Sequence, residues 1–319
     1  MDRSPPLPWT NIAKLIALSL PAVVIVVPTD LPPPSGIIGF MTGFLACLYG
    51  SYRWAFAAIS VAIAAAFLSM TSAVLSPFGA TYGVALLLCL IAAGSWRRGG
   101  RPAMIFAAFG WVFLLFSPQA DIFSQILLTL VFGLSGVWGI FAARQLAVSG
   151  VMAPKAEGQM APSLVSVFVV SGGFLVTLAL TEWFTISRPY WVPFIYLHVV
   201  ATTGLSRKSP ILRRMAGVLI GAAVAFALIA AGGPFILHIL AAVGAFALSL
   251  RLLTTRPLIS RALTTTAIVL IVFATDESAL SSRLLAEVSA VIILLIVAAV
   301  LGFVTPRAPS SVSDTKTQT

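Results

Sequence analysis

The sequence predicts an all-α polytopic membrane protein of about twelve transmembrane helices, built as two parallel six-helix repeats. Three observations lead to this fold class. The chain is too apolar to cover a water-facing surface, its apolar runs have about the length of membrane spans, and two stretches half a chain apart resemble each other.

The composition places the chain in a lipid bilayer. Of its 319 residues 60% are hydrophobic and only 9% are charged, and the mean hydropathy is +1.07. Soluble domains carry about 25% charged residues. The net charge of +10 comes from basic residues that lie between apolar runs rather than in one patch, so we expect no nucleic-acid partner.

Twelve apolar runs of roughly 17–25 residues are candidate spans. The first six cover residues 12–28, 36–50, 54–74, 80–96, 102–117 and 122–142. The second six cover residues 164–182, 190–204, 212–231, 235–250, 258–274 and 284–304. The second and eighth runs are short for a span, so either flanking residues lengthen them or they are half-helices.

Each run ends where glycine, proline or charge interrupts it. In the first half the breaks read "PTDLPPPS", "SYR", "SPFG", "RRGGR" and "PQAD". In the second half they read "TISRP", "SRKSP", "AGGP", "TTRP" and "TDES". No small-residue cleavage site follows the first run, so we interpret it as a retained helix rather than a signal peptide.

Charge placement supports twelve spans with both termini in the cytoplasm. Cytoplasmic loops of membrane proteins collect Lys and Arg. This topology puts all but Arg188 and Arg283 of the 19 basic residues on one side. The other side receives five acids, namely Asp30, Asp121, Glu182, Asp276 and Glu277.

The repeat is clearest where each half turns into its last two helices. "RPAMIFAAFGWVFLLFSPQADIFSQILL" begins at Arg101, and "RPLISRALTTTAIVLIVFATDESALSSRLL" begins at Arg256. Each has Arg-Pro, an apolar helix, a short acidic outer loop and a final long helix. Because six is an even number of crossings, both halves enter the membrane in the same direction.

These boundaries divide the chain into five parts. They are a cytoplasmic N-terminus (1–11), the first six-helix repeat (12–146), a cytoplasmic linker (147–163), the second repeat (164–305) and a polar, disordered cytoplasmic tail (306–319).

Ionisable groups within spans are costly, so each is a functional candidate. His198 lies seven residues after Trp191, roughly 10–12 Å deeper along the helix, and its ordinary pKa of about 6.5 suits proton exchange. The alternative is a neutral imidazole bonded to a neighbouring helix. Glu287 follows Arg283 by four residues on one helix face, so the pair is either an ion pair or a proton site with its modulator.

Basic residues at the cytoplasmic ends are candidates for binding an anion. Arg213 and Arg214 immediately precede the ninth span, and Arg261 lies in a second basic group on the same side. An arginine fork can hold a carboxylate at two points. Ordinary positive-inside charge also explains them.

Small residues recur at helix-packing spacing. Gly39 and Gly43, Gly79 and Gly83, and Gly217 and Gly221 form GxxxG pairs, and Gly133, Gly136 and Gly139 recur every third residue. Such positions let two helices approach closely, so we interpret them as packing sites.

A duplicated twelve-span chain favours a transporter or channel over a membrane scaffold or a lipid-modifying enzyme. No HExxH, GxSxG or Walker motif is present, so we expect no enzyme, and we expect neither a metal nor a cofactor. A major-facilitator protein is disfavoured because the loop "YGSYRW" after the second span has no acid. A ten-span inverted-repeat transporter conflicts with the charge distribution.

The segment "RPYWVPFIYLHVVATTGLSRKSPILRRMAGVLIGAAVAFAL" resembles the fusaric acid resistance (FUSC-type) and aromatic acid exporter families. The resemblance rests on Tyr190 and Trp191 at a helix start, a basic loop with arginines, and a GxxxGA helix from Gly217 to Ala222. "RALTTTAIVLIVF" and "SSRLLAEVSAVIILL" are similar to the last two helices of these families, with Arg283 in place of a late arginine. The likeness covers about 164–304, and the first half matches in architecture alone.

This resemblance implies a proton-driven inner-membrane exporter of aromatic or related organic acids. Arg213, Arg214, Arg261, Tyr190 and Trp191 would bind the substrate, and His198, Glu287 and Arg283 would couple its movement to protons. A passive organic-anion channel of the same fold is the alternative, as in plant malate channels, where two six-helix subunits surround an arginine-lined pore; a non-transporting scaffold comes third. A periplasmic adaptor or a homo-oligomer would be further partners beside the substrate and the bilayer.

Overall fold

The computed structural model describes residues 8–26, 31, 34–72, 77–95, 100–117, 121–150, 164–183, 190–203, 208–253, 255–273 and 279–304. These residues form twelve α-helices and no strand. The first six are α1 (Trp9–Val24), α2 (Pro34–Leu48), α3 (Tyr52–Ser72), α4 (Pro77–Gly94), α5 (Arg101–Leu115) and α6 (Ile122–Gln145). The others are α7 (Leu164–Trp183), α8 (Trp191–Thr203), α9 (Lys208–Ala230), α10 (Phe235–Leu252), α11 (Pro257–Phe273) and α12 (Ala279–Val304).

All twelve predicted helices are therefore present, each near its predicted position. Within the described residues, 3 helical stretches are long and apolar enough to cross a membrane by themselves: Tyr52–Thr71, Ile122–Gln145 and Leu164–Trp183. The predicted shortness of the second and eighth elements is confirmed, since α2 has 15 residues and α8 has 13. A 13-residue helix is only about 20 Å long, less than the roughly 30 Å hydrocarbon core.

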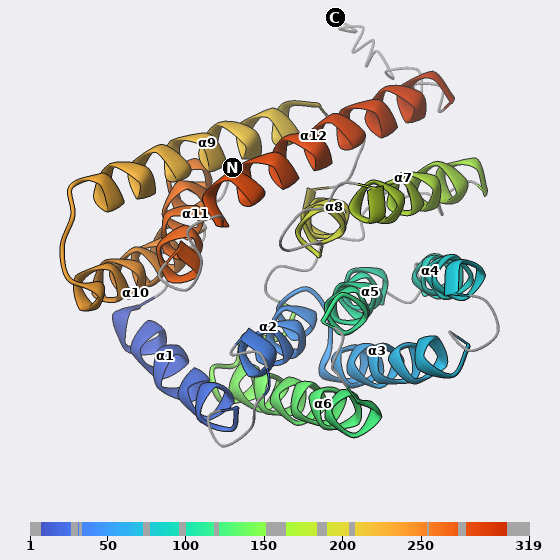
Figure 1. The fold of residues 1–319 in the computed structure, drawn as a ribbon, viewed down its shortest axis with the longest axis horizontal. Coiled ribbons are helices and arrows are strands. Elements are labelled where there is room, and N and C mark those ends of the chain that lie inside the picture. The colour runs from blue at the N-terminus through green and yellow to red at the C-terminus, as the bar shows by residue number, and fades with distance from the viewer. Residues whose placement is uncertain are drawn as a thin grey trace, which may run out of the picture.

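Helices α2, α5 and α8 lie inside the bundle, with α1, α6, α3, α4, α7 and α12 around them (Figure 1). Each inner helix packs against several others: α2 on α1, α3, α5 and α6; α5 on α2, α3, α4 and α8; α8 on α5, α7 and α12. The large core runs through these helices, and its fully buried side chains include Trp111, Phe106 and Phe132. Helices α9, α10 and α11 enclose a small second core of alanine, valine and leucine.

Glycine brings two helix pairs into backbone contact. A β-carbon added to Gly43 of α2 would collide with the carbonyl oxygen of Gly136 on α6, and one added to Gly221 of α9 would collide with the carbonyl oxygen of Ala262 on α11. The packing role predicted for these glycines is confirmed. For Gly83 the prediction is wrong, because no described residue lies within 4 Å of its added β-carbon.

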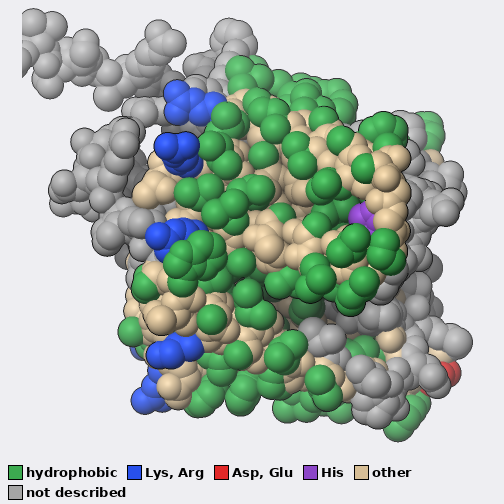
Figure 2. Space-filling model, turned by 90° about the vertical axis from the view of Figure 1, so that its left-hand side faces the viewer, with side chains coloured by type: hydrophobic (Ala, Val, Ile, Leu, Met, Phe, Trp, Pro, Cys, Tyr) green, Lys and Arg blue, Asp and Glu red, His purple; other side chains and the backbone are tan. Residues whose placement is uncertain are grey.

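Two short contacts each join helix ends that the predicted topology places on the same side of the membrane. The Gly150 N–H, just after α6, donates to the Cys47 carbonyl oxygen in α2 at 2.8 Å. The Arg251 guanidinium, at the end of α10, lies 4.7 Å from the ring centre of Trp9, where α1 starts. Figure 2 shows Lys and Arg along one edge of the molecule and an acidic side chain near the opposite edge. This separation agrees with the alternating helix directions that the sequence predicts.

Candidate functional site: an aromatic seam between α5 and α8

Aromatic rings join α5 of the first half to α8 of the second. The Phe109 ring stacks on the Phe194 ring, with centroids 3.7 Å apart and planes 17° from parallel. On one side of this stack the edge of Phe113 meets Tyr190 at 5.7 Å, and on the other Phe106 meets His198 at 6.4 Å. We call these six residues the aromatic seam: Phe106, Phe109, Phe113, Tyr190, Phe194 and His198.

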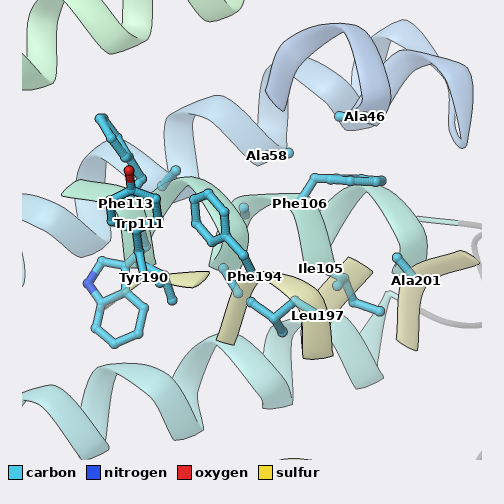
Figure 3. Packing of buried hydrophobic residues seen from close by; sticks show 14 of the residues in the cluster. Ala46, Ala58, Ile105, Phe106, Trp111, Phe113, Tyr190, Phe194, Leu197 and Ala201 are labelled. Carbon is cyan, nitrogen blue, oxygen red and sulfur yellow. The ribbon is translucent and has the colours of Figure 1, made fainter. Parts of the chain in front are cut away.

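Helical spacing explains why the rings meet. The α5 rings follow one another at three and four residues, and the α8 rings at four and four, so each set lies on one face of its helix. From one contacting pair of rings to the next, the residue number rises in α8 and falls in α5, so the two helices are antiparallel. In Figure 3, Phe113 and Tyr190 lie at one end of the seam and Phe106 lies toward the other, on the side of Ala201.

The seam is held by its surroundings. Phe106 and Phe113 are fully buried, Tyr190 and Phe194 are buried, and Phe109 and His198 are partly buried. The Tyr196 hydroxyl donates to the Val170 carbonyl oxygen at 2.7 Å and ties α8 to α7. The Trp111 indole N–H donates to the Ser69 hydroxyl oxygen at 2.8 Å and ties α5 to α3. Because their own halves fix both helices, the α5–α8 contact is a contact between the halves.

Three of the residues singled out in the sequence lie at the start of α8 or within it. The Trp191 ring lies 5.3 Å from Tyr190 and 6.1 Å from Phe194, so Tyr190, Trp191 and His198 line one helix face. His198 continues the row of rings that faces α5, because its ring meets that of Phe106.

The arginines lie elsewhere. Arg213 is exposed near the start of α9, and Arg261 is partly buried near the start of α11. The β-carbon of Arg261 would lie 3.1 Å from one added to Gly217, so the start of α11 packs against the middle of α9. Helix α9 reaches α8 only at a small contact. The side chains of Arg214, Arg283 and Glu287 lie outside the described residues.

Sequence reasoning missed Phe106, Phe109, Phe113 and Phe194. The available signal was the matching helical spacing of aromatic residues in the fifth and eighth runs. That signal is weak, because both runs are apolar on every face, and a phenylalanine in such a run can face lipid as favourably as it can face another helix.

The bundle and its seam define an all-helical membrane protein. Residues 175–304 match the family model described as fusaric acid resistance protein-like. This match confirms the expected resemblance for most of the second half, and it includes α8 through α12 but not α5. No curated protein and no solved structure matches the sequence. The matched family is one of membrane transport and resistance proteins rather than enzymes.

Proposed function

We propose that the protein exports aromatic or other small organic acids across the inner membrane, driven by protons moving the other way. The observation that carries this proposal is the aromatic seam, which places a titratable ring, His198, among apolar rings between the two halves of the chain. A transporter has to alternate between conformations at such a contact, and a histidine there can change charge near neutral pH.

We also propose that the halves are two parallel six-helix repeats. Most pairs of packed helices support this, since adding six to each helix number converts a pair of the first half into a pair of the second; α2·α5 and α3·α4 have no comparable counterpart among the described residues. The pairs α1·α2, α1·α6, α2·α6, α3·α5, α3·α6 and α4·α5 have the counterparts α7·α8, α7·α12, α8·α12, α9·α11, α9·α12 and α10·α11. The contact of α4 with α7, between halves, has its counterpart in α10 with α1.

The substrate enters, in this proposal, from the end that carries Arg213 and Arg261, which faces the cytoplasm together with both termini. Positive charge there raises the local concentration of anions. Tyr190 and Trp191 contact the substrate further along, and His198 exchanges the proton, with Arg214, Arg283 and Glu287 as further members of the anion and proton sites. A periplasmic adaptor or a second copy of the chain would complete the assembly.

Inverted membrane vesicles test the transport direction and its coupling. We expect uptake of benzoate, corrected for vesicles without the protein, to rise severalfold when the vesicle interior is made acidic. His198→Ala should remove the dependence on the gradient. The matched control His238→Ala, which changes a partly buried histidine of α10, should keep it.

Each result separates the candidate functions. Flux that ignores the pH gradient in the unmodified protein supports an anion channel of the same fold. Absence of any protein-dependent flux supports a scaffold. Gradient-driven flux that survives His198→Ala limits the histidine to packing.

A further inference from the structure

We propose that the aromatic seam binds the ring of the transported acid, and that Phe109 and Phe194 determine selectivity for aromatic over saturated rings. This inference rests on the proposed function and names the substrate class and the residues that select it.

The central pair of the seam differs in geometry from the pairs on either side. Phe109 and Phe194 lie face to face, whereas the rings on either side, Phe113 with Tyr190 and Phe106 with His198, meet edge to face. Among the described residues, the other parallel stacks, such as Phe40 with Phe44 and Phe113 with Phe132, lie inside the first half. The flat stack that would come apart if the halves separate is therefore Phe109 on Phe194.

Separation of the two halves at α5 and α8 would expose the faces of Phe109 and Phe194. Parting α5 from α8 breaks the stack and leaves two ring faces without a partner. An aromatic cargo placed between them stacks on both faces and restores the lost contacts. A saturated ring of the same size has no π-face, so it fills the space without restoring the stacking.

The carboxylate of an aromatic acid would also have a partner in the seam. His198 follows Phe194 by one helical turn, about 6 Å along the axis, on the side of Phe106. A carboxylate attached directly to a ring held beside Phe194 can reach this imidazole. The seam thus pairs flat apolar faces with one titratable donor, which matches an aromatic carboxylate.

Two probes differ only in the property at issue. Benzoate and cyclohexanecarboxylate have the same charge and nearly the same size, but only benzoate is aromatic. We expect the purified protein in nanodiscs to bind benzoate about three- to tenfold more tightly by calorimetry. Phe109→Leu and Phe194→Leu should each remove most of this preference, whereas Phe194→Tyr should keep it.

Phe44→Leu is the matched control, because it removes one ring of a stack that lies within α2. This variant should retain the preference for benzoate. Equal binding of the two acids by the unmodified protein, or an unchanged preference in both leucine variants, would overturn the inference. If the leucine variants do not fold, saturation transfer from protein aromatic protons to the ring protons of benzoate tests the unmodified protein, and its absence has the same consequence.

The binding experiment and the vesicle experiment distinguish failure of the ring site from failure of the proposed export. A preference for benzoate without any flux in vesicles leaves the ring site standing and removes the exporter. Gradient-driven flux without a preference removes the ring site and leaves the exporter.

Discussion

The three-helix sets α3–α4–α5 and α9–α10–α11 share two internal contacts but differ in the third and in their surroundings, because α3 packs on α4 and α9 shows no comparable packing on α10 among the described residues. In both, the last helix packs on the other two. Helix α5 also packs on α2 and α8 and belongs to the large core, whereas α11 packs beyond its own set only on α12 in the part of the chain that the structure describes. Exchanging the halves would convert the contact of α5 with α8 into one of α11 with α2, and those helices share no comparable packing among the described residues.

Side-chain size explains the difference. The buried face of α5 carries Phe106, Trp111 and Phe113, which reach past its own set. Apart from Val269 and Leu270, the buried face of α11 carries alanine and hydroxyl-bearing side chains, and the Thr266 hydroxyl donates to the Gly221 carbonyl oxygen of α9 at 2.9 Å. One set is thus fixed within the main core, and the other is attached at few points.

Removing a large side chain from α5 should have the largest effect. Trp111 is fully buried, bonds to Ser69 of α3 and meets the edge of Phe174 of α7 at 6.5 Å. Trp111→Ala should cost about 3–5 kcal/mol of unfolding free energy and raise hydrogen exchange in α3, α5 and α7. Leu270→Ala in the second core is the matched change, and its faster exchange should stay within α9–α11. Equal spread of the two effects would contradict the separation of the cores.

Glycine substitutions should have smaller effects that are alike in the two halves. Gly43→Ala and Gly221→Ala each place a methyl group against a backbone carbonyl, so each should cost about 1–3 kcal/mol. Gly83→Ala serves as the control, since its added β-carbon meets no described residue within 4 Å, and it should not destabilise the protein. Thermal unfolding in detergent measures all three. A tolerated Gly221→Ala beside a damaging Gly43→Ala would show that α9–α11 yields where α2–α6 does not.

The sequence predicted the positions of the helices better than their mutual contacts. Each break contains Gly, Pro or charge, which interrupts an apolar run, so the ends of the twelve helices were predictable to within about five residues. The stack of Phe109 on Phe194 was not, because α5 and α8 are apolar all round and no polar face marks the side that turns inward. The packing role predicted for Gly83 was wrong for the same reason, because the sequence does not show which face of a helix is packed, and GxxxG indicates a close approach only where a second helix lies against it. His198 could be singled out because it is a polar residue in an apolar run, whereas its partner ring, Phe106, could not.

The smallest effect concerns the start of α6 and tests the repeat directly. Asp121 caps this helix, since its carboxylate accepts from the Ser124 N–H at 2.8 Å and from the Ser124 hydroxyl at 2.7 Å. These bonds, the backbone N–H first, lower the pKa of Asp121 below its ordinary 3.8. A carboxyl group whose folded pKa is lowered stabilises the folded state above its ordinary pKa, and this stabilisation is lost as the pH falls through the folded value.

Asp121→Ala should therefore speed hydrogen exchange in the first turn of α6 at pH 7, and the difference from the unmodified protein should shrink as the medium is acidified below pH 3.8. Asp276 stands 155 positions later, the offset that separates the Arg-Pro pairs at Arg101 and Arg256. If the halves are true repeats, Asp276→Ala should do the same at the start of α12, with the same dependence on pH. An effect at α6 with none at α12 would mean that the likeness of the two halves does not extend to their outer loops.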